Sequence, residues 1–237
     1  MGRFFESLRG ARKSTAPHFV RDYERLVRGL LRRKNIDEAM SVAVGGAYDQ
    51  MGAVEADILR WAGLSDGMAV VDFGCGSGRL AHALGKRCNI DYVGIDVVQS
   101  LLDYAKTKSP PGYRFIRSQA IGLPLPDNSA DMITSFSVFT HLMPWESYLY
   151  LQDMRRVLKP AGRIVMSFLE FANANHWPPF EAQFGGRGPI NMHIERPVID
   201  LWCEKLGLVR ETFIDGGAHP WGDAPLGQSA AVILNQK

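Results

Sequence analysis

Apolar residues change their spacing at about residue 69 of the 237-residue chain. Before that point they recur every three to four positions, which is the period of an amphipathic helix. Two helices are predicted there, over 17–33 and 48–61, with Gly45 and Gly46 between them. We expect the first helix to be a cap over the domain rather than part of its core. Its apolar positions, set among arginines, are Leu26, Val27, Leu30 and Leu31.

From residue 69 onward, short β-rich runs alternate with helical stretches, which is typical of βαβ units on a parallel sheet. A helix is predicted to start at Pro144 and to end before the run 159–162, and another covers about 197–206. The predicted strands are 69–73, 91–95, 113–117, 131–136, 163–168, 208–213 and 230–234.

The composition, with 46% hydrophobic and 22% charged residues, is that of an ordinary soluble globular domain. No apolar run approaches the roughly 20 residues of a membrane helix, and the basic N-terminus lacks the apolar core of a secretory leader. Cys75, Cys88 and Cys203 are widely spaced and form no Cys-x-x-Cys pair, which argues against disulfides and a zinc site. We therefore expect a cytoplasmic α/β domain that holds no metal.

The charge is unevenly distributed although the formal net charge is only +2. Residues 1–34 contain ten Lys and Arg against three acids, whereas the rest of the chain contains 17 against 22. Such asymmetry is compatible with a contact to nucleic acid or to an anionic membrane. A basic helical face is more often simply solvated, and that is the interpretation we prefer here.

The run 70–79 carries the most chemical information, because a buried strand enters a glycine-rich turn and then a helix that begins near Arg79. Glycines let the backbone approach a ligand closely, and the free N–H groups of a helix start favour an electronegative partner. A dinucleotide fingerprint would need its third glycine where Arg79 stands. The run therefore predicts a nucleotide-like ligand and disfavours a pyrophosphate.

Two acids bracket this glycine run. Asp72 precedes the turn and can accept a hydrogen bond from an ammonium group or a bridging water. Asp96 ends the next strand, 22 positions after Gly74, where a carboxylate can accept from both hydroxyls of a ribose. Each acid alone could be a turn cap or a surface charge, but together with the glycines they predict a nucleoside ligand.

Residues 70–80 resemble the first motif of the class I S-adenosylmethionine-dependent methyltransferases, and Asp96 lies where that family has its ribose-binding acid. Three later segments resemble further motifs of the family, in the same order: 122–127, 131–136 and 156–163. The resemblance covers about 48–170.

The family resemblance implies a Rossmann-like three-layer α/β sandwich. Its seven-stranded sheet would be mostly parallel, with one antiparallel strand at the edge, and would bind S-adenosylmethionine over the ends of the first strands. Residues 1–47 would form an N-terminal helical cap or lid, and 48–237 the methyltransferase domain.

The resemblance also implies which residues contact the cofactor. The glycines would approach the methionine, Asp96 the ribose and Val97 the adenine, while Gln119 stands where the family commonly has an acid. Ser135 and Phe136 would face the methyl group, although Phe136 fits equally well as a core residue. The implied contacts are Asp72, Gly74, Cys75, Gly76, Gly78, Asp96, Val97, Gln119, Ala120, Ser135 and Phe136.

Methyl transfer is an in-line displacement that requires mainly alignment, and a hydroxyl acceptor also profits from a base. We predict that base among His141, Glu170 and His193. His141 could equally be a packing histidine. Residues 170–196, rich in aromatic and amide side chains, are predicted to be an acceptor-pocket insertion, the alternative being an Ω-like loop packed on its own side chains.

The leading hypothesis is thus an enzyme that methylates a small molecule, a hydroxylated metabolite or a saccharide, on oxygen or nitrogen and releases S-adenosylhomocysteine. An RNA methyltransferase is the alternative, with the basic N-terminus on phosphates, but the sequence contains no recognisable RNA-binding module. Two further alternatives are a non-catalytic S-adenosylmethionine-binding module and, more remotely, an NAD-dependent enzyme. The sequence indicates neither the acceptor nor the oligomeric state.

Overall fold

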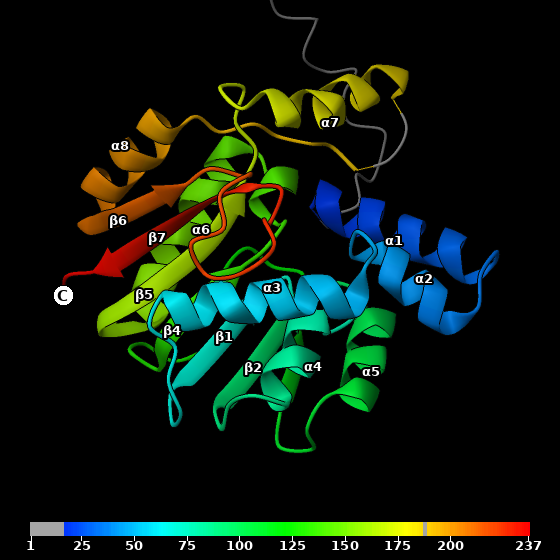
Figure 1. Ribbon diagram of the computed structural model, residues 1–237, viewed down its shortest axis with the longest axis horizontal. Helices are drawn as coiled ribbons and strands as arrows, with labels where there is room; N and C mark the ends of the chain where they lie inside the picture. The colour runs from blue at the N-terminus through cyan, green and yellow to red at the C-terminus, as the bar shows by residue number, and fades with distance from the viewer. Residues whose placement is uncertain (1–16, 187–188) are drawn as a thin grey trace, which may run out of the picture.

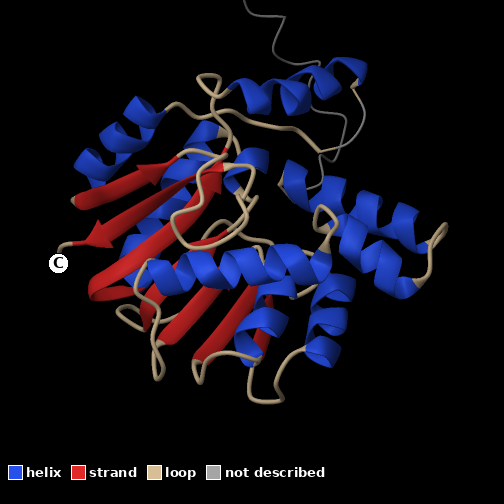
Figure 2. Cartoon of the chain, in the orientation of Figure 1, coloured by secondary structure: helices blue, strands red, loops and turns tan. Residues whose placement is uncertain are grey.

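A computed structural model describes residues 17–186 and 189–237 of the chain. A central sheet is covered by helices on both faces (Figures 1 and 2). One apolar core lies between the sheet and α3 and α4, and a second between the sheet and α6 and α8. A third, smaller apolar cluster joins α1 and α2 to α5. The helices are α1 (His18–Leu31), α2 (Ile36–Ala43), α3 (Tyr48–Trp61), α4 (Arg79–Gly85), α5 (Gln99–Lys108), α6 (Pro144–Val157), α7 (Trp177–Glu181) and α8 (Arg196–Leu206).

The sheet has seven strands in the order β3-β2-β1-β4-β5-β7-β6. All neighbours are parallel except the pairs that β7 makes with β5 and β6. The antiparallel strand therefore lies one place in from the edge and not at the edge as expected, because β7 inserts between β5 and β6. The strands are β1 (Ala69–Phe73), β2 (Asp91–Asp96), β3 (Arg114–Arg117), β4 (Ala130–Ser135), β5 (Leu158–Phe168), β6 (Leu208–Ile214) and β7 (Ser229–Asn235).

Most elements match the sequence predictions within one or two residues, and β5 and α2 are the main differences. β5 begins at Leu158 rather than 163, because the chain enters the sheet directly after α6 and pairs Leu158 with Ala130 before a bulge. α2 was not predicted. It is short and is capped by Asn35, whose Oδ1 accepts a hydrogen bond from Glu38 N at 2.9 Å.

The start of α1 belongs to the core, although the whole helix was expected to be a cap. Phe19 and Val20 are buried and join the apolar cluster beneath α6 and α8. Leu31, which was expected on the apolar side, is 39% exposed. Residues 1–16 of the predicted cap, including several of its basic side chains, lie outside the described residues. None of the helices in the described ranges is long and apolar enough to cross a membrane.

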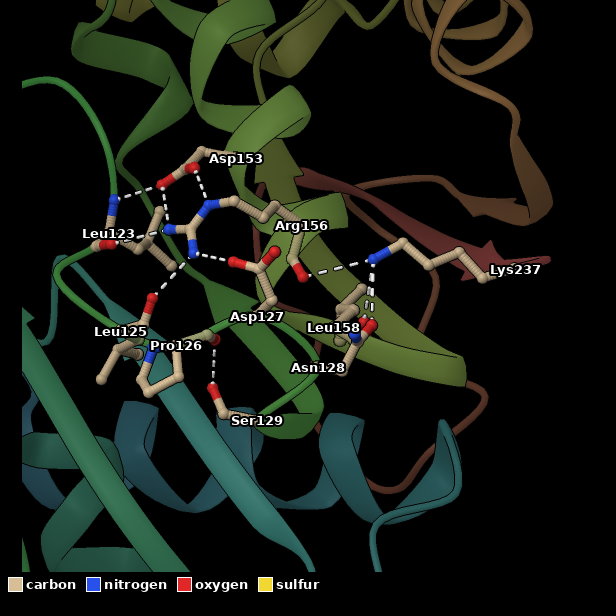
Figure 3. Close-up of polar contacts among 10 residues, drawn as sticks. All are labelled: Leu123, Leu125, Pro126, Asp127, Asn128, Ser129, Asp153, Arg156, Leu158 and Lys237. Atoms are coloured by element: carbon tan, nitrogen blue, oxygen red, sulfur yellow. Dashed lines mark hydrogen bonds and ion pairs between the residues drawn. The ribbon is translucent and has the colours of Figure 1, made fainter.

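Two of the segments that carried the family resemblance, 122–127 and 156–163, are joined by the side chain of Arg156 (Figure 3). Its guanidinium donates to the carbonyl oxygens of Leu123 and Leu125 at 3.0 and 2.8 Å and pairs with Asp127 and Asp153. Arg156 thereby fixes the loop before β4 to the end of α6. This explains in physical terms why the two runs occur together.

The close packing of α3 on α4 depends on Gly52. A Cβ at Gly52 would overlap the backbone carbonyl oxygen of Arg79, the first residue of α4. The two helices therefore approach each other to a distance that no side chain at this position allows.

We expect Gly52→Ala to lower the free energy of unfolding by about 1–3 kcal/mol, because overpacking outweighs the better helix propensity of alanine. Gly29→Ala in α1 is the matched control. Its Cβ meets nothing within 4 Å among the described residues, so it should raise stability by about 0.5–1 kcal/mol. Urea denaturation measures both, and equal stabilisation by the two substitutions would contradict the packing argument.

Candidate active site

A cavity of about 290 Å³ lies beyond the carboxyl ends of β1, β2 and β4. This is the switch point of the sheet, where the chain leaves neighbouring strands in opposite directions and where open α/β sheets bind ligands. The glycine run forms one wall. Side chains from α1 and from the segments after α2 and β4 form the others.

The glycine run has the conformation that the sequence predicted. Gly74, Gly76 and Gly78 have φ angles of 77°, 54° and 82°, values that disfavour any other residue. A Cβ at Gly74 would overlap the Val138 side chain, and one at Gly76 the Val44 side chain. Gly74 and Gly76 line the cavity, so the backbone itself is exposed to a ligand.

Asp96 is held at the cavity by two backbone N–H groups. Gly76 N donates to its Oδ2 and Val98 N to its Oδ1, each at 2.9 Å. Each carboxylate oxygen has a second lone pair, so Asp96 can still accept two hydrogen bonds from a ligand. Two neighbouring acceptors of this kind match the two hydroxyls of a ribose.

Asp72 lies deeper in the same wall and is only 3% exposed. Burial raises its pKa to about 7, although the Tyr92 hydroxyl, which donates to Oδ2 at 2.6 Å, favours the ionised form. A positively charged ligand group nearby would favour ionisation further.

Arg79 stands where a dinucleotide fingerprint would have its third glycine, and its side chain is part of the cavity wall. Its Nε donates to both carboxylate oxygens of Glu55, at 2.9 and 3.1 Å, and its Nη1 donates to the carbonyl oxygen of Val44. Glu55, on α3, is 2% exposed. No local pattern indicates this partner, because 24 residues separate Glu55 from Arg79.

His141 lines the cavity from the short 3₁₀ helix that follows β4, Phe139–His141. Its Nδ1 lies 2.6 Å from the carbonyl oxygen of Ile190. A carbonyl can only accept, so Nδ1 carries the proton and Nε2 of the neutral ring keeps a free lone pair. Burial lowers the pKa of His141, and the nearby His18 lowers it slightly more.

The cavity brings eight of the predicted site residues together and leaves six outside. Gly78 instead caps α4, where a Cβ would overlap Ala105 of α5. Ser135 is fully buried in β4. The residues that line the cavity are Asp72, Gly74, Cys75, Gly76, Asp96, Val97, Phe136 and His141, and those outside are Gly78, Gln119, Ala120, Ser135, Glu170 and His193.

Gln119 was expected to contact adenine, but its amide nitrogen donates to Glu24 of α1 at 3.1 Å and to the Val97 carbonyl at 3.2 Å. Its neighbour Ser118 lines the cavity instead, and Ala120 is exposed. The placement therefore favours Ser118 over Gln119 for a ligand contact.

Glu170 and His193 lie in other surroundings. Glu170 is 1% exposed and is held by Arg196, at 2.8 and 2.9 Å, and by the Ser229 hydroxyl at 2.5 Å. The His193 ring stacks on Phe171 with centroids 4.4 Å apart. Neither placement favours the predicted role as a base.

None of the described residues between 170 and 196 lines the cavity. Phe171, Trp177 and Phe180 pack on one another with ring centroids 5.1–5.7 Å apart. This arrangement corresponds to the alternative of a loop packed on its own side chains. The segment reaches the site through the Ile190 carbonyl that orients His141.

Several lining residues were not predicted. Tyr23 could have been found, because it stands four positions before Val27 on the same side of α1. Gln228 could not, since it reaches Ser137 from 91 positions away, its Nε2 donating to Ser137 Oγ at 3.1 Å. The unpredicted lining residues include Phe19, Tyr23, Val44, Arg79, Ser118, Ser137, Val138, Leu142, Tyr150 and Gln228.

Residues 71–166 match the family model described as a methyltransferase domain. A demethylmenaquinone methyltransferase of Staphylococcus aureus is 31% identical over 124 residues, which are 50% of each chain. The bifunctional biotin biosynthesis protein of Cellvibrio japonicus is 27% identical over 63% of this chain and 30% of its own length. The chain thus spans half or less of these curated relatives.

Solved structures of methyltransferases share the fold. The magnesium protoporphyrin IX methyltransferase of Synechocystis, solved with bound S-adenosylhomocysteine, has a TM-score of 0.64 and 16% identity over 91% of this chain and 97% of that one. An S-adenosylmethionine-dependent methyltransferase of Mesorhizobium loti has a TM-score of 0.62 and 18% identity over 77% and 98%. Residues 71–166 thus match a methyltransferase domain, and the described residues share the fold of these S-adenosylmethionine-dependent methyltransferases.

The similar structure from Mesorhizobium loti is named for S-adenosylmethionine, and that from Synechocystis was solved with bound S-adenosylhomocysteine. The residues of the present cavity fit S-adenosylmethionine. The exposed glycine backbone leaves room for the methionine portion. Asp96 retains two acceptors for the ribose hydroxyls, and the acidic Asp72 suits the cationic groups. The apolar Val97 and the hydroxyl of Ser118 stand at the remaining end.

The raised pKa of Asp72 makes the stability of the ligand-free protein depend on pH. The folded chain holds a proton up to about pH 7, whereas the unfolded chain releases it near the ordinary pKa of 3.8. The stabilisation is therefore complete below 3.8 and is lost as the pH rises through about 7. Between pH ~5 and pH ~8 it should fall by about 2–3 kcal/mol.

Asp72→Asn should remove this dependence, so the difference in unfolding free energy between variant and wild type should change by that amount across the interval. Urea denaturation at several pH values measures it. A difference that stays constant with pH would show that Asp72 titrates normally.

Proposed function

We propose that this methyltransferase transfers the methyl group of S-adenosylmethionine to a hydroxyl of a small, largely apolar acceptor, with His141 as the general base. The observation that carries the proposal is the placement of a neutral histidine with a free Nε2 in the same cavity as Asp96 and the glycine run. The cofactor, when bound, supplies an electrophilic methyl group on a sulfonium sulfur.

The chain's own residues supply binding and orientation. Asp96 accepts the ribose hydroxyls, and the backbone of Gly74 and Gly76 faces the methionine portion. Arg79 is the donor available to a carboxylate, because its Nη1 and Nη2 each carry a second N–H beside those that bond Val44 and Glu55. Since a displacement of this kind needs mainly alignment and exclusion of water, the cover that Phe19 and Tyr23 of α1 give the cavity matters as much as any charge.

His141 is placed to remove the proton from the acceptor. As the hydroxyl oxygen forms its bond to the methyl carbon, the hydroxyl proton passes to Nε2, and the electron pair of the breaking carbon–sulfur bond stays on sulfur. The Ile190 carbonyl fixes the ring orientation and keeps Nδ1 protonated. Burial keeps the ring neutral at physiological pH, as a base requires.

The remaining walls of the cavity support the choice of acceptor. Phe136, Leu142 and Tyr150 make one part of it apolar. Ser137 adds a hydroxyl whose oxygen already accepts from Gln228 Nε2, so its proton is available for an oxygen of the acceptor. Ser137 is itself in the left-handed region at φ 59°, held by its N–H bond to Ser167 Oγ at 2.7 Å.

Two of the similar proteins are named for organic acceptors, a demethylmenaquinone and magnesium protoporphyrin IX, and these names support a small-molecule acceptor. A saccharide acceptor loses its main support, because the aromatic and amide residues of 170–196 do not line the cavity. The cover of α1 over the cavity likewise disfavours a base within a folded RNA.

Asp96→Ala is expected to weaken binding of S-adenosylmethionine and S-adenosylhomocysteine by about 10- to 100-fold, because two hydrogen bonds to a charged group are lost. Isothermal titration calorimetry measures this. Asp91→Ala, at the opposite exposed end of β2, is the matched control and should bind normally. Binding of NAD alone would overturn the assignment of the cofactor.

The His141 ring should titrate below its ordinary pKa of 6.5, because burial disfavours the charged form. NMR of the ring protons measures this without any acceptor. With an acceptor found by screening for S-adenosylhomocysteine release, kcat/KM should fall as the pH drops through the pKa of His141. His141→Ala should lose about 10²–10⁴-fold in rate and also the acid limb.

His193→Ala, which alters a histidine outside the cavity, is the control and should keep that limb. If His141→Ala kept both the rate and the acid limb, the role of His141 as base would be wrong, while the assignment of the cofactor would be unaffected.

A further inference from the structure

The outer face of α1 carries a row of basic side chains that the candidate active site does not use. They follow one another at i, i+4, i+7 and i+11, so they fall within an arc of about 60° and extend about 16 Å along the axis. All are exposed, and none pairs with an acid within residues 17–186 or 189–237. This arginine row consists of Arg21, Arg25, Arg28 and Arg32.

Contacts on the inner face of α1 keep the arginine row on the side that faces solvent. Phe19 and Val27 are buried at 7% and 2% exposure, and the Tyr23 ring packs edge-on against His141 with centroids 5.3 Å apart. The helix lies at one end of the molecule beside α2 (Figure 1). It therefore cannot turn its arginines inward without losing core contacts.

The two acids of α1 do not neutralise the row. Glu24 pairs with Arg117 of β3 at 2.9 Å, and Asp22 lies 3.9 Å from the His18 ring. The first contact turns Glu24 toward β3, and the second holds Asp22 near His18 at the start of α1. The row thus remains a line of positive charge on a chain whose remainder, residues 35–237, contains more acids than bases.

Exposed apolar side chains stand where the row ends. Leu31, in the last turn of α1, is 39% exposed, and Ile36, the first residue of α2, is 56% exposed. Cationic side chains next to exposed apolar ones match the boundary between anionic headgroups and acyl chains.

We propose that the arginine row, with Leu31 and Ile36, docks this protein on a membrane surface that contains anionic phospholipid. Each arginine gains attraction from the negative surface potential, and the two apolar side chains enter the headgroup boundary. Because Phe19 and Tyr23 of the same helix line the cavity, the docked surface lies about one helix diameter, roughly 10 Å, from it. This proposal does not depend on the proposed function.

An anionic lipid surface fits these observations better than RNA. Single strands bind grooves in which aromatic rings stack on the bases. The aromatic residues of α1, Phe19 and Tyr23, face inward, so the row offers charge on a convex helix without a stacking surface.

Sedimentation of the full chain with vesicles tests the proposal. It should bind vesicles of phosphatidylcholine containing one third phosphatidylglycerol, more weakly at high salt, and should not bind phosphatidylcholine alone. Changing all four arginines of the row to Gln should lower partitioning several hundred-fold, at roughly fivefold per charge. Leu31→Ser with Ile36→Ser should lower it by a smaller factor.

The matched control removes the same charge from other faces. This control variant changes four exposed residues, with the substitutions Arg60→Gln, Lys86→Gln, Lys106→Gln and Lys205→Gln. It should retain at least half of the wild-type partitioning, and all variants should keep the wild-type circular dichroism and melting temperature.

Three results would overturn the proposal: no binding of wild type to the anionic vesicles, equal loss in the row and control variants, or unchanged binding of the row variant. Binding to polyuridylate but not to vesicles, lost in the row variant, would assign the row to RNA instead.

Discussion

The buried ion pair between Arg79 and Glu55 holds together the parts that form the cavity. Arg79 begins α4 directly after the glycine run, Glu55 lies inside α3, and Arg79 also bonds the Val44 carbonyl after α2. Removal of either charge would leave the other buried and unpaired, which typically costs about 3–5 kcal/mol. The ion pair therefore links three parts of the fold: the loop that approaches the ligand, the helix that supports this loop and the helices that cover the cavity.

The cavity beside this ion pair combines features that would be unfavourable elsewhere in a fold. The three glycines of the glycine run have positive φ, Ser137 is in the left-handed region, and Asp72 is buried with a raised pKa. Such features cluster where a ligand is bound, because the ligand supplies the missing partners. The hydrogen bonds of Asp96 to Gly76 and Val98 show the same principle, since they orient a carboxylate and leave half of its acceptors unused.

The sequence predicted those parts of this structure that depend on local patterns. β1 and α3 were predicted at their observed bounds, because a buried parallel strand is a continuous apolar run and an amphipathic helix has a clear period. The glycine run and Asp96 were found because their spacing is local to one βαβ unit. Other features depend on tertiary contacts, so no local pattern could indicate them. They are the pairing of Arg79 with Glu55, the hydrogen bond of Gln228 to Ser137 and the placement of Glu170 outside the cavity. The expectation that 170–196 lines an acceptor pocket rested on composition alone. An aromatic composition fits a loop packed on its own side chains as well as it fits a ligand wall.

The contribution of Gln228 to the cavity has a consequence for the order in which the protein matures during synthesis. Gln228 immediately precedes β7, the last strand, which pairs with β5 and β6 on both sides. On a ribosome, the glycine run and α1 emerge long before it, but the hydrogen-bonded group of Ser137, Ser167 and Gln228 cannot close until the last strand inserts. A nascent chain without β7 would thus present an incomplete binding wall, and ligand capture would be delayed until β7 has inserted, when it can stabilise a sheet that has just become complete.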